Sequence, residues 1–161
     1  MNEPLASGAR KRLLQVLALY APGADTLRVR LHRLRGVAIG ERTFIGTDVL
    51  LDTSHPEMIS IGAGVDIGAR TMVIAHQQGE AQRDGVSVLI EDEVFVGPGS
   101  IILPHVTLGR GAVVHAGSVV TRSVPPLTMV RGNPAAPVAR CGVPLGRSTP
   151  LREFTRQLQP L

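Results

Sequence analysis

Branched apolar residues recur every six positions through the middle of the chain. In the most regular stretch they stand at Ile90, Val96, Ile102, Leu108, Val114 and Val120. Two positions before each comes a small or medium-sized residue, at Val88, Val94, Ser100, Val106, Ala112 and Ser118. The same spacing occurs earlier, at Ile39, Ile45 and Leu51 and again at Ile61, Ile67 and Val73. Because a six-residue period fits neither an α-helix nor an alternating strand but is typical of short stacked strands and turns, we predict an all-β solenoid with an apolar interior.

Two interruptions break the period. The first, at residues 52–60, holds four residues more than a regular repeat and contains His55. The second lies between Val73 and Ile90 and includes the polar, glycine-containing residues 77–86. Because long connections lie on the surface and often carry function, we predict an excursion loop at residues 77–86 that leaves the solenoid and crosses its surface.

The segments on either side of the repeats predict a cap and a tail. Residues 10–20 and 25–35 have the apolar spacing of two short helices, so residues 1–35 are expected to form a helical cap on the open end of the solenoid. The solenoid itself is predicted to span residues 36–140. Residues 141–161 hold three prolines and are predicted to form a partly helical or loose tail.

The composition narrows the class of protein. The 161 residues suffice for one domain, and the aromatic residues are three Phe and one Tyr, so the core must consist mainly of small branched side chains. A single cysteine, Cys141, can form neither an intramolecular disulfide nor a cysteine metal cluster. No apolar run approaches the roughly 20 residues of a membrane-spanning helix. We therefore expect a reduced, cytoplasmic protein of one domain.

Positive charge is concentrated at the N-terminus. Residues 1–35 hold seven Lys and Arg against Glu3 and Asp25, a net charge of +5, whereas the whole chain carries +4. The simplest explanation is a solvated helix face, and the alternative is a peripheral contact of these helices with an anionic membrane. Nucleic acid is not expected as a partner, because no aromatic residues interleave the arginines to stack on bases.

Four motifs, in this order along the chain, resemble those of a known family of enzymes. They are Gly-Val-Ala-Ile-Gly at residues 36–40, Ile-Ser-Ile-Gly at 59–62, Gly-Ser-Val-Val-Thr-Arg at 117–122 and Gly-Asn-Pro-Ala at 132–135. Over residues 28–140 the chain resembles the hexapeptide-repeat acyltransferases, and among them the maltose, galactoside and colanic-acid O-acetyltransferases. The resemblance implies a left-handed parallel β-helix that transfers an acetyl group from acetyl-CoA, without a metal, to a hydroxyl of a sugar or polysaccharide precursor.

The resemblance points to one histidine as the catalytic base. In the resembled enzymes, a histidine at the end of a coil, directly before the excursion loop, deprotonates the acceptor hydroxyl. His76 occupies that place, and a neutral imidazole, with an ordinary pKa of about 6.5, suits a general base near neutral pH. Asp52, Asp66 and Glu80 are close enough in sequence to orient its ring, and the sequence does not choose among them. Asp52 and His55, at the first interruption, are also candidates for the acceptor pocket.

The resemblance also implies where acetyl-CoA binds. The resembled enzymes hold the pantetheine arm with backbone groups of the late coils and the phosphates with basic side chains. The matching positions of this chain are Gly97, Pro98, Ala116, Gly117, Thr121, Arg122 and, for the nucleotide end, Arg140. Arg122 stands where the family more often has Lys, which keeps the positive charge but changes its geometry.

The resembled enzymes are typically homotrimers with active sites between neighbouring subunits. His76 is therefore expected to face acetyl-CoA held largely by the adjacent subunit. Two alternatives remain, a non-catalytic β-helix scaffold for assembly and a metalloenzyme similar to the γ-type carbonic anhydrases. The carbonic anhydrases have two histidine ligands close together in one stretch, whereas His76, His105 and His115 fall on successive coils here. The sequence favours the acetyltransferase.

Overall fold

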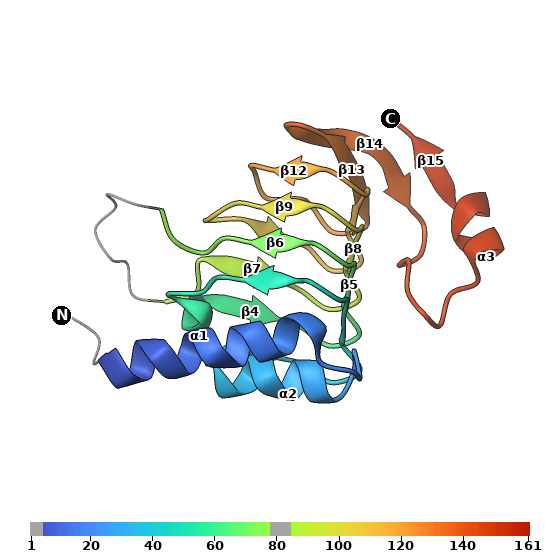
Figure 1. Ribbon diagram of the computed structural model, residues 1–161. Helices are drawn as coiled ribbons and strands as arrows, with labels where there is room; N and C mark the ends of the chain where they lie inside the picture. The colour runs from blue at the N-terminus through green and yellow to red at the C-terminus, as the bar shows by residue number, and fades with distance from the viewer. Residues whose placement is uncertain (1–4, 78–84) are drawn as a thin grey trace.

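The computed structural model describes residues 5–77 and 85–161, with side chains from residue 8 onward. Its centre is a three-sided solenoid of short parallel strands (Figure 1). Two helices, α1 (Leu5–Tyr20) and α2 (Leu27–Leu34), lie across its N-terminal end, and a small unit of strands and one helix follows the last coil.

Three sheets form the walls of the solenoid. The first wall contains β1 (Ala38–Ile39), β4 (Ile59–Ile61), β7 (Val88–Ile90) and β10 (Thr107–Leu108). The second contains β2 (Phe44–Ile45), β5 (Asp66–Ile67), β8 (Phe95–Val96), β11 (Val113–Val114) and β13 (Thr128–Gly132). The third contains β3 (Leu50–Leu51), β6 (Met72–Val73), β9 (Ile101–Ile102) and β12 (Val119–Val120). Successive strands visit the walls in turn, so three hexapeptides make one coil, which confirms the predicted solenoid.

The inward branched side chains form a ladder on each wall. In the second wall, one ladder consists of Ile45, Ile67, Val96, Val114 and Val130, which occupy matching register positions. Each of these side chains is at most 2% exposed. The stacked coils therefore bury one continuous apolar column, as the six-residue period predicts.

Two inward positions hold serine instead of an apolar residue. Ser100 Oγ donates to the Gly97 carbonyl oxygen at 2.7 Å, and Ser118 Oγ donates to the His115 carbonyl oxygen at 2.7 Å. Because each hydroxyl reaches a carbonyl of its own turn, the buried serines are satisfied without disturbing the ladders.

The glycine that follows an inward residue is required by the close approach of neighbouring coils. A Cβ added at Gly97 would lie 2.4 Å from the backbone nitrogen of Ala116 in the next coil. Positive φ angles occur instead in the turns, as at Gly117, where φ is +70°. The two glycines predicted to bind the cofactor thus have different structural reasons to be glycine.

The N-terminal helices cover the first coil and satisfy its carbonyl groups. On α1, Gln15 Nε2 donates to the Val49 carbonyl oxygen at 3.2 Å, and on α2, Arg28 Nη1 donates to that of Ile45 at 2.6 Å. Helix α1 begins at Leu5, earlier than predicted, because its first turns contain alanines, which are strong helix formers. Within the described residues, no helix is long and apolar enough to cross a membrane.

The C-terminal residues fold back along the end of the solenoid. Strand β14 (Ala135–Cys141) pairs antiparallel with β13, and β15 (Leu158–Pro160) pairs antiparallel with β14. Helix α3 (Leu151–Arg156) places Phe154 in a second small core with Val113 and Cys141. The parallel coils therefore end with β13, before the predicted boundary at residue 140, and the predicted tail has regular structure.

Arg147 ties this C-terminal unit to the solenoid. Its guanidinium nitrogens lie 3.3 Å from carboxylate oxygens of both Asp25 and Asp66, and its Cζ lies 4.5 Å from the ring centroid of Phe44. Burial raises the pKa of Asp66 above its ordinary value, and the opposing attraction of Arg147 is the smaller effect. Asp66, on the second wall, is thus paired with Arg147.

Candidate functional site

Both interruptions of the repeat open at the edge where the third wall turns into the first, which we call the loop edge. Its described segments are residues 52–58, 74–77, 85–87, 103–106 and 121–123. They carry His55, His76, His105 and Arg122 on four successive coils, and adjacent coils are about 4.8 Å apart. The predicted catalytic residue thus shares one edge with part of the predicted cofactor site.

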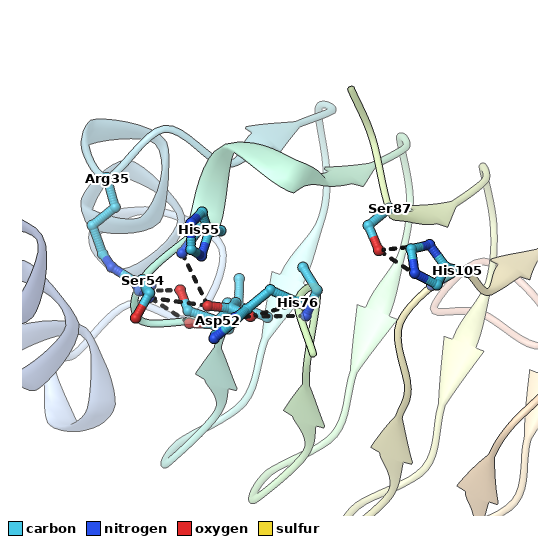
Figure 2. A network of polar contacts seen from close by, with 9 residues as sticks. Arg35, Asp52, Ser54, His55, His76, Ser87 and His105 are labelled. Atoms are coloured by element: carbon cyan, nitrogen blue, oxygen red, sulfur yellow. Dashed lines mark hydrogen bonds and ion pairs between the residues drawn. The ribbon is translucent and has the colours of Figure 1, made fainter. Parts of the chain in front are cut away.

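Asp52 and His76 form a short hydrogen bond at the loop edge (Figure 2). Asp52 Oδ2 lies 2.6 Å from His76 Nδ1, although 24 residues separate the two in sequence. Asp52 follows β3 and His76 follows β6, and these strands are neighbours in the third wall, with Leu51 paired to Val73. The register of adjacent coils therefore brings the two side chains together.

The carboxylate of Asp52 is buried and accepts several hydrogen bonds. The N–H groups of Ser54 and His55 donate to Oδ1, both at 3.0 Å. Those of Ala75 and His76 donate to Oδ2 at 2.9 and 3.2 Å. Burial alone would raise the pKa of Asp52, but the donors, led by the His55 N–H and the His76 ring, outweigh burial and hold the pKa below its ordinary value. Asp52 is therefore ionised at neutral pH.

The charge on Asp52 decides which nitrogen of His76 carries the proton. An ionised carboxylate can only accept, so Nδ1 of His76 donates to it, and Nε2 of the neutral ring keeps its lone pair. The side chain of His76 is 37% exposed, whereas that of Asp52 is 2% exposed. His76 thus combines a basic nitrogen in an accessible ring with a buried anion that holds the ring in place.

Of the three acids considered from the sequence, Asp52 is the one that contacts His76 in the described part of the chain. Asp66 is engaged with Arg147 on another wall, and Glu80, with most of the predicted excursion loop, lies outside the described residues. The role of Asp52 in the acceptor pocket stays a prediction; its carboxylate is buried, and both oxygens accept hydrogen bonds from the protein.

His55 is the side chain that the first interruption adds beside His76. Their ring centroids are 4.7 Å apart, and the ring planes are inclined by 52°. Nδ1 of His55 is buried and has no hydrogen-bond partner within residues 5–77 and 85–161. Leaving a buried ring nitrogen without a partner is costly, whereas the His55 residue as a whole is partly exposed. His55 therefore stays a candidate for the acceptor pocket.

The same three side chains could also hold a metal ion. One ligand atom from each of Asp52, His55 and His76 lies within 4.8 Å of the others, and two imidazoles with one carboxylate suit Zn²⁺. A metal bound through Nε2 of His76 would remove the lone pair that a base needs, and one bound through Nδ1 would replace the hydrogen bond to Asp52. Metal binding and base catalysis therefore exclude each other at His76.

Arg35 lies beneath this site, although its sequence context predicts a solvated helix face. It is 2% exposed, and its Nη2 donates to the carbonyl oxygens of Asp52 at 2.7 Å and Leu51 at 3.0 Å. Burial lowers the pKa of Arg35 to about 10 against the attraction of Asp52, so the guanidinium stays charged at neutral pH. The only sequence signal is its position directly before the first repeat, where a long donor reaches the end of the first coil.

His32 is the buried partner of Arg35. Arg35 Nη1 lies 3.0 Å from His32 Nδ1, and because a guanidinium can only donate, Nδ1 accepts and the ring is neutral. Burial first, and then the charges of Arg35 and Arg28, lower the pKa of His32 to about 3. His32 is thus a structural histidine that supports the floor of the site.

His105 and His115 do not lie beside His76. His105 lies one coil further along the loop edge, where its Nδ1 is 3.4 Å from Ser87 Oγ (Figure 2). His115 is exposed at the edge between the second and third walls. In the described part of one chain, His76, His105 and His115 therefore do not form a metal site like that of a carbonic anhydrase.

Part of the predicted cofactor site lines a pocket on the loop edge. Thr121 and Arg122 lie two coils beyond His76 and line a pocket of about 500 Å³. The other lining residues are Ser123, Val124, Pro125, Val130, Pro134, Ala135, Ala136 and Pro137. The Gly-Asn-Pro-Ala motif therefore contributes to this pocket through its proline and alanine.

The rest of the predicted cofactor site lies elsewhere on the same chain. Gly97, Pro98, Ala116 and Gly117 are at the edge between the second and third walls. Arg140 is exposed on β14, outside the lining of the pocket. One chain thus places the two halves of the predicted cofactor site on separate edges of its solenoid.

Comparison with known proteins identifies the repeats. Residues 87–122 match the family model of the bacterial transferase hexapeptide, which describes six repeats. The Bacillus subtilis protein YvoF, provisionally named an acetyltransferase, is 41% identical over 118 residues, which cover 73% of this chain and 69% of that protein.

Solved structures agree with this assignment. A hexapeptide-repeat acetyltransferase of Vibrio cholerae, crystallised with acetyl-CoA, is 27% identical, covers 84% of this chain and 87% of its own, and has a TM-score of 0.66. The acetyltransferase NeuO, specific for polysialic acid, is 26% identical, with coverage of 70% and 55% and a TM-score of 0.56. The chain therefore belongs to the hexapeptide-repeat acetyltransferases, and its solenoid is the left-handed parallel β-helix of that family.

Proposed function

We propose that this protein transfers the acetyl group of acetyl-CoA to a hydroxyl of a sugar or polysaccharide precursor, with His76 as the general base. The observation that carries the proposal is the 2.6 Å hydrogen bond between His76 Nδ1 and the ionised, buried Asp52. It leaves Nε2 free to take a proton beside the predicted excursion loop.

The reaction needs one base that later acts as an acid. His76 Nε2 takes the proton of the acceptor hydroxyl as its oxygen attacks the thioester carbonyl carbon. The tetrahedral intermediate then collapses, the carbon–sulfur bond breaks, and the departing thiolate of CoA takes the proton back from His76. Asp52 stabilises the imidazolium between these steps, because its charge lies 2.6 Å from Nδ1.

Acetyl-CoA as the donor is supported by the Vibrio cholerae relative, which binds it, and by the pocket on the loop edge. Arg122 at that pocket supplies a positive charge for a phosphate of CoA. Because the other predicted cofactor residues lie on a separate edge, one chain alone does not surround the ligand. In a closed homotrimer, the Gly97 edge of one subunit faces the loop edge of the next and completes the site between them.

The choice of a glycan acceptor is supported by NeuO, whose acceptor is polysialic acid. His55 is the residue that would meet such an acceptor, because it is partly exposed and its ring lies 4.7 Å from that of His76. A sugar offers several hydroxyls, one to react at His76 and another to bond to His55.

The proposal is tested by thiol release from acetyl-CoA with a panel of sugars and small alcohols, for the wild type and His76→Ala. Acceptor-dependent release should fall by about 100-fold or more in His76→Ala, the usual contribution of a general base, while calorimetry shows unchanged acetyl-CoA binding. If the wild type binds no acetyl-CoA and turns over no acceptor, the scaffold alternative is the better account. If activity requires Zn²⁺ and is lost on chelation, a metal ion bound by Asp52, His55 and His76 is the better explanation, and His76 is not a general base.

A further inference from the structure

The outward face of helix α1 is apolar, which is unusual for a helix on a protein surface. Leu13, Val16, Leu17 and Tyr20 are spaced as one helix face and are 61%, 59%, 51% and 71% exposed. The opposite face, with Ala18, is buried against the solenoid. A surface helix normally turns its polar residues outward, so this face indicates a contact with something outside the chain.

The charges around this face are positive. At 100° per residue, Arg10 and Arg12 lie on either side of the apolar stripe near the start of α1, and both are exposed. Helix α2 adds the exposed Arg30 and Arg33. Two exposed acids beside these helices are already paired, Glu57 with Lys11 of α1 at 3.1 Å and Asp25 with Arg147 at 3.3 Å. The partner should therefore be apolar at its centre and negatively charged around it.

We propose that α1 docks this protein on an anionic lipid bilayer, with Leu13, Val16 and Leu17 in the acyl boundary and Arg10 and Arg12 among the headgroups. An apolar helix face flanked by arginines is the pattern of a helix that lies in the membrane interface. A second copy placed face to face on this stripe fits less well, because it would bring the same exposed arginines and no exposed acid of α1 or α2 that is free to pair with them.

The same helix is linked to the candidate active site. Arg35 Nε donates to the Lys11 carbonyl oxygen on α1 at 3.2 Å, and Arg35 Nη2 donates to the Asp52 carbonyl oxygen at 2.7 Å. Membrane docking through α1 would therefore hold the loop edge close to the bilayer surface. The docking itself is independent of the proposed function.

The experiment is co-sedimentation of the full chain with phosphatidylcholine vesicles, with and without about 30 mol% phosphatidylglycerol. We expect binding to the anionic vesicles, weaker binding to the neutral ones, and release as ionic strength rises to about 0.5 M. The variants Leu13→Ser/Leu17→Ser and Arg10→Gln/Arg12→Gln should each lower the partition coefficient about tenfold or more. The control Leu151→Ser, at a residue 69% exposed on α3, should bind like the wild type.

Two further measurements separate a bilayer from other occupants. If light scattering shows that Leu13→Ser/Leu17→Ser changes the oligomeric state, a second copy covers this face and the proposal is overturned. A large loss of thermal stability in that variant would contradict it as well, because it would mean that the face is packed inside the protein or its assembly. Equal binding of the wild type to neutral and anionic vesicles, or none to either, also refutes anionic docking.

Discussion

Replacing Asp52 by Asn tests the core of the proposed mechanism with a change of almost no volume. The Asp52 carboxylate is surrounded only by donors, the N–H groups of Ser54 and His55 at Oδ1 and those of Ala75 and His76, with the His76 ring, at Oδ2. An amide can offer one oxygen to such donors, and its NH₂ group must point at the others. Either orientation leaves buried N–H groups without acceptors.

The expected magnitudes follow from this geometry. If the NH₂ faces Ser54 and His55, two part-buried donors are left unsatisfied, at about 1 kcal/mol each, so stability should fall by about 2 kcal/mol. If the NH₂ faces His76, the ring must accept at Nδ1 and carry its proton on Nε2, which removes the base. In both cases the anion that stabilises the imidazolium is gone, and kcat should fall by about 100-fold or more.

The assay is steady-state thiol release, with thermal unfolding measured in parallel. The KM for acetyl-CoA should change little in Asp52→Asn, because the predicted cofactor residues lie on other coils. The matched control is Asp48→Asn, since the Asp48 side chain is 44% exposed and its ion pair with Arg70 is long at 4.0 Å, and it should resemble the wild type in both measurements. A folded Asp52→Asn protein that keeps kcat within about threefold of the wild type would refute the orienting role of Asp52.

Three further predictions concern other parts of the molecule. The pKa of His32 is about 3 in the folded protein and 6.5 ordinarily, so between these pH values the unfolded chain binds a proton that the folded protein does not. The free energy of unfolding should therefore be highest above pH 6.5 and fall by roughly 4–5 kcal/mol as the pH approaches 3. Urea titrations of His32→Gln should show a weaker dependence of this free energy on pH. Gly97→Ala should cost about 1–3 kcal/mol in thermal unfolding, because its Cβ would meet a backbone nitrogen at 2.4 Å, whereas Gly146→Ala, with open space around it, should be nearly neutral. Arg122→Gln should raise the KM for acetyl-CoA about fivefold, because a contact with a phosphate of CoA is lost, and should leave the KM for acetyl-pantetheine unchanged. An equal rise in both KM values would contradict a phosphate contact by Arg122.

The sequence by itself determines the solenoid. Position within a six-residue repeat decides whether a side chain points inward, so the ladder from Ile90 to Val120 can be read one repeat at a time. The family resemblance, rather than the spacing, points to His76, because this histidine stands at the end of a coil directly before an interruption, where the resembled enzymes have their base. The ladder depends on local spacing alone, and local spacing is fully present in the chain.

Only the tertiary structure decides which residues surround His76. Asp52 meets His76 because β3 and β6 stack in register and because the first interruption turns its N–H groups back onto the carboxylate. Arg35, which the sequence places on a basic helix, is buried because the end of the first coil offers unpaired carbonyls within its reach. These outcomes depend on how the interruptions and the N-terminal helices fit against separate coils in space, whereas the repeat pattern predicts only which inward side chains stack in successive coils.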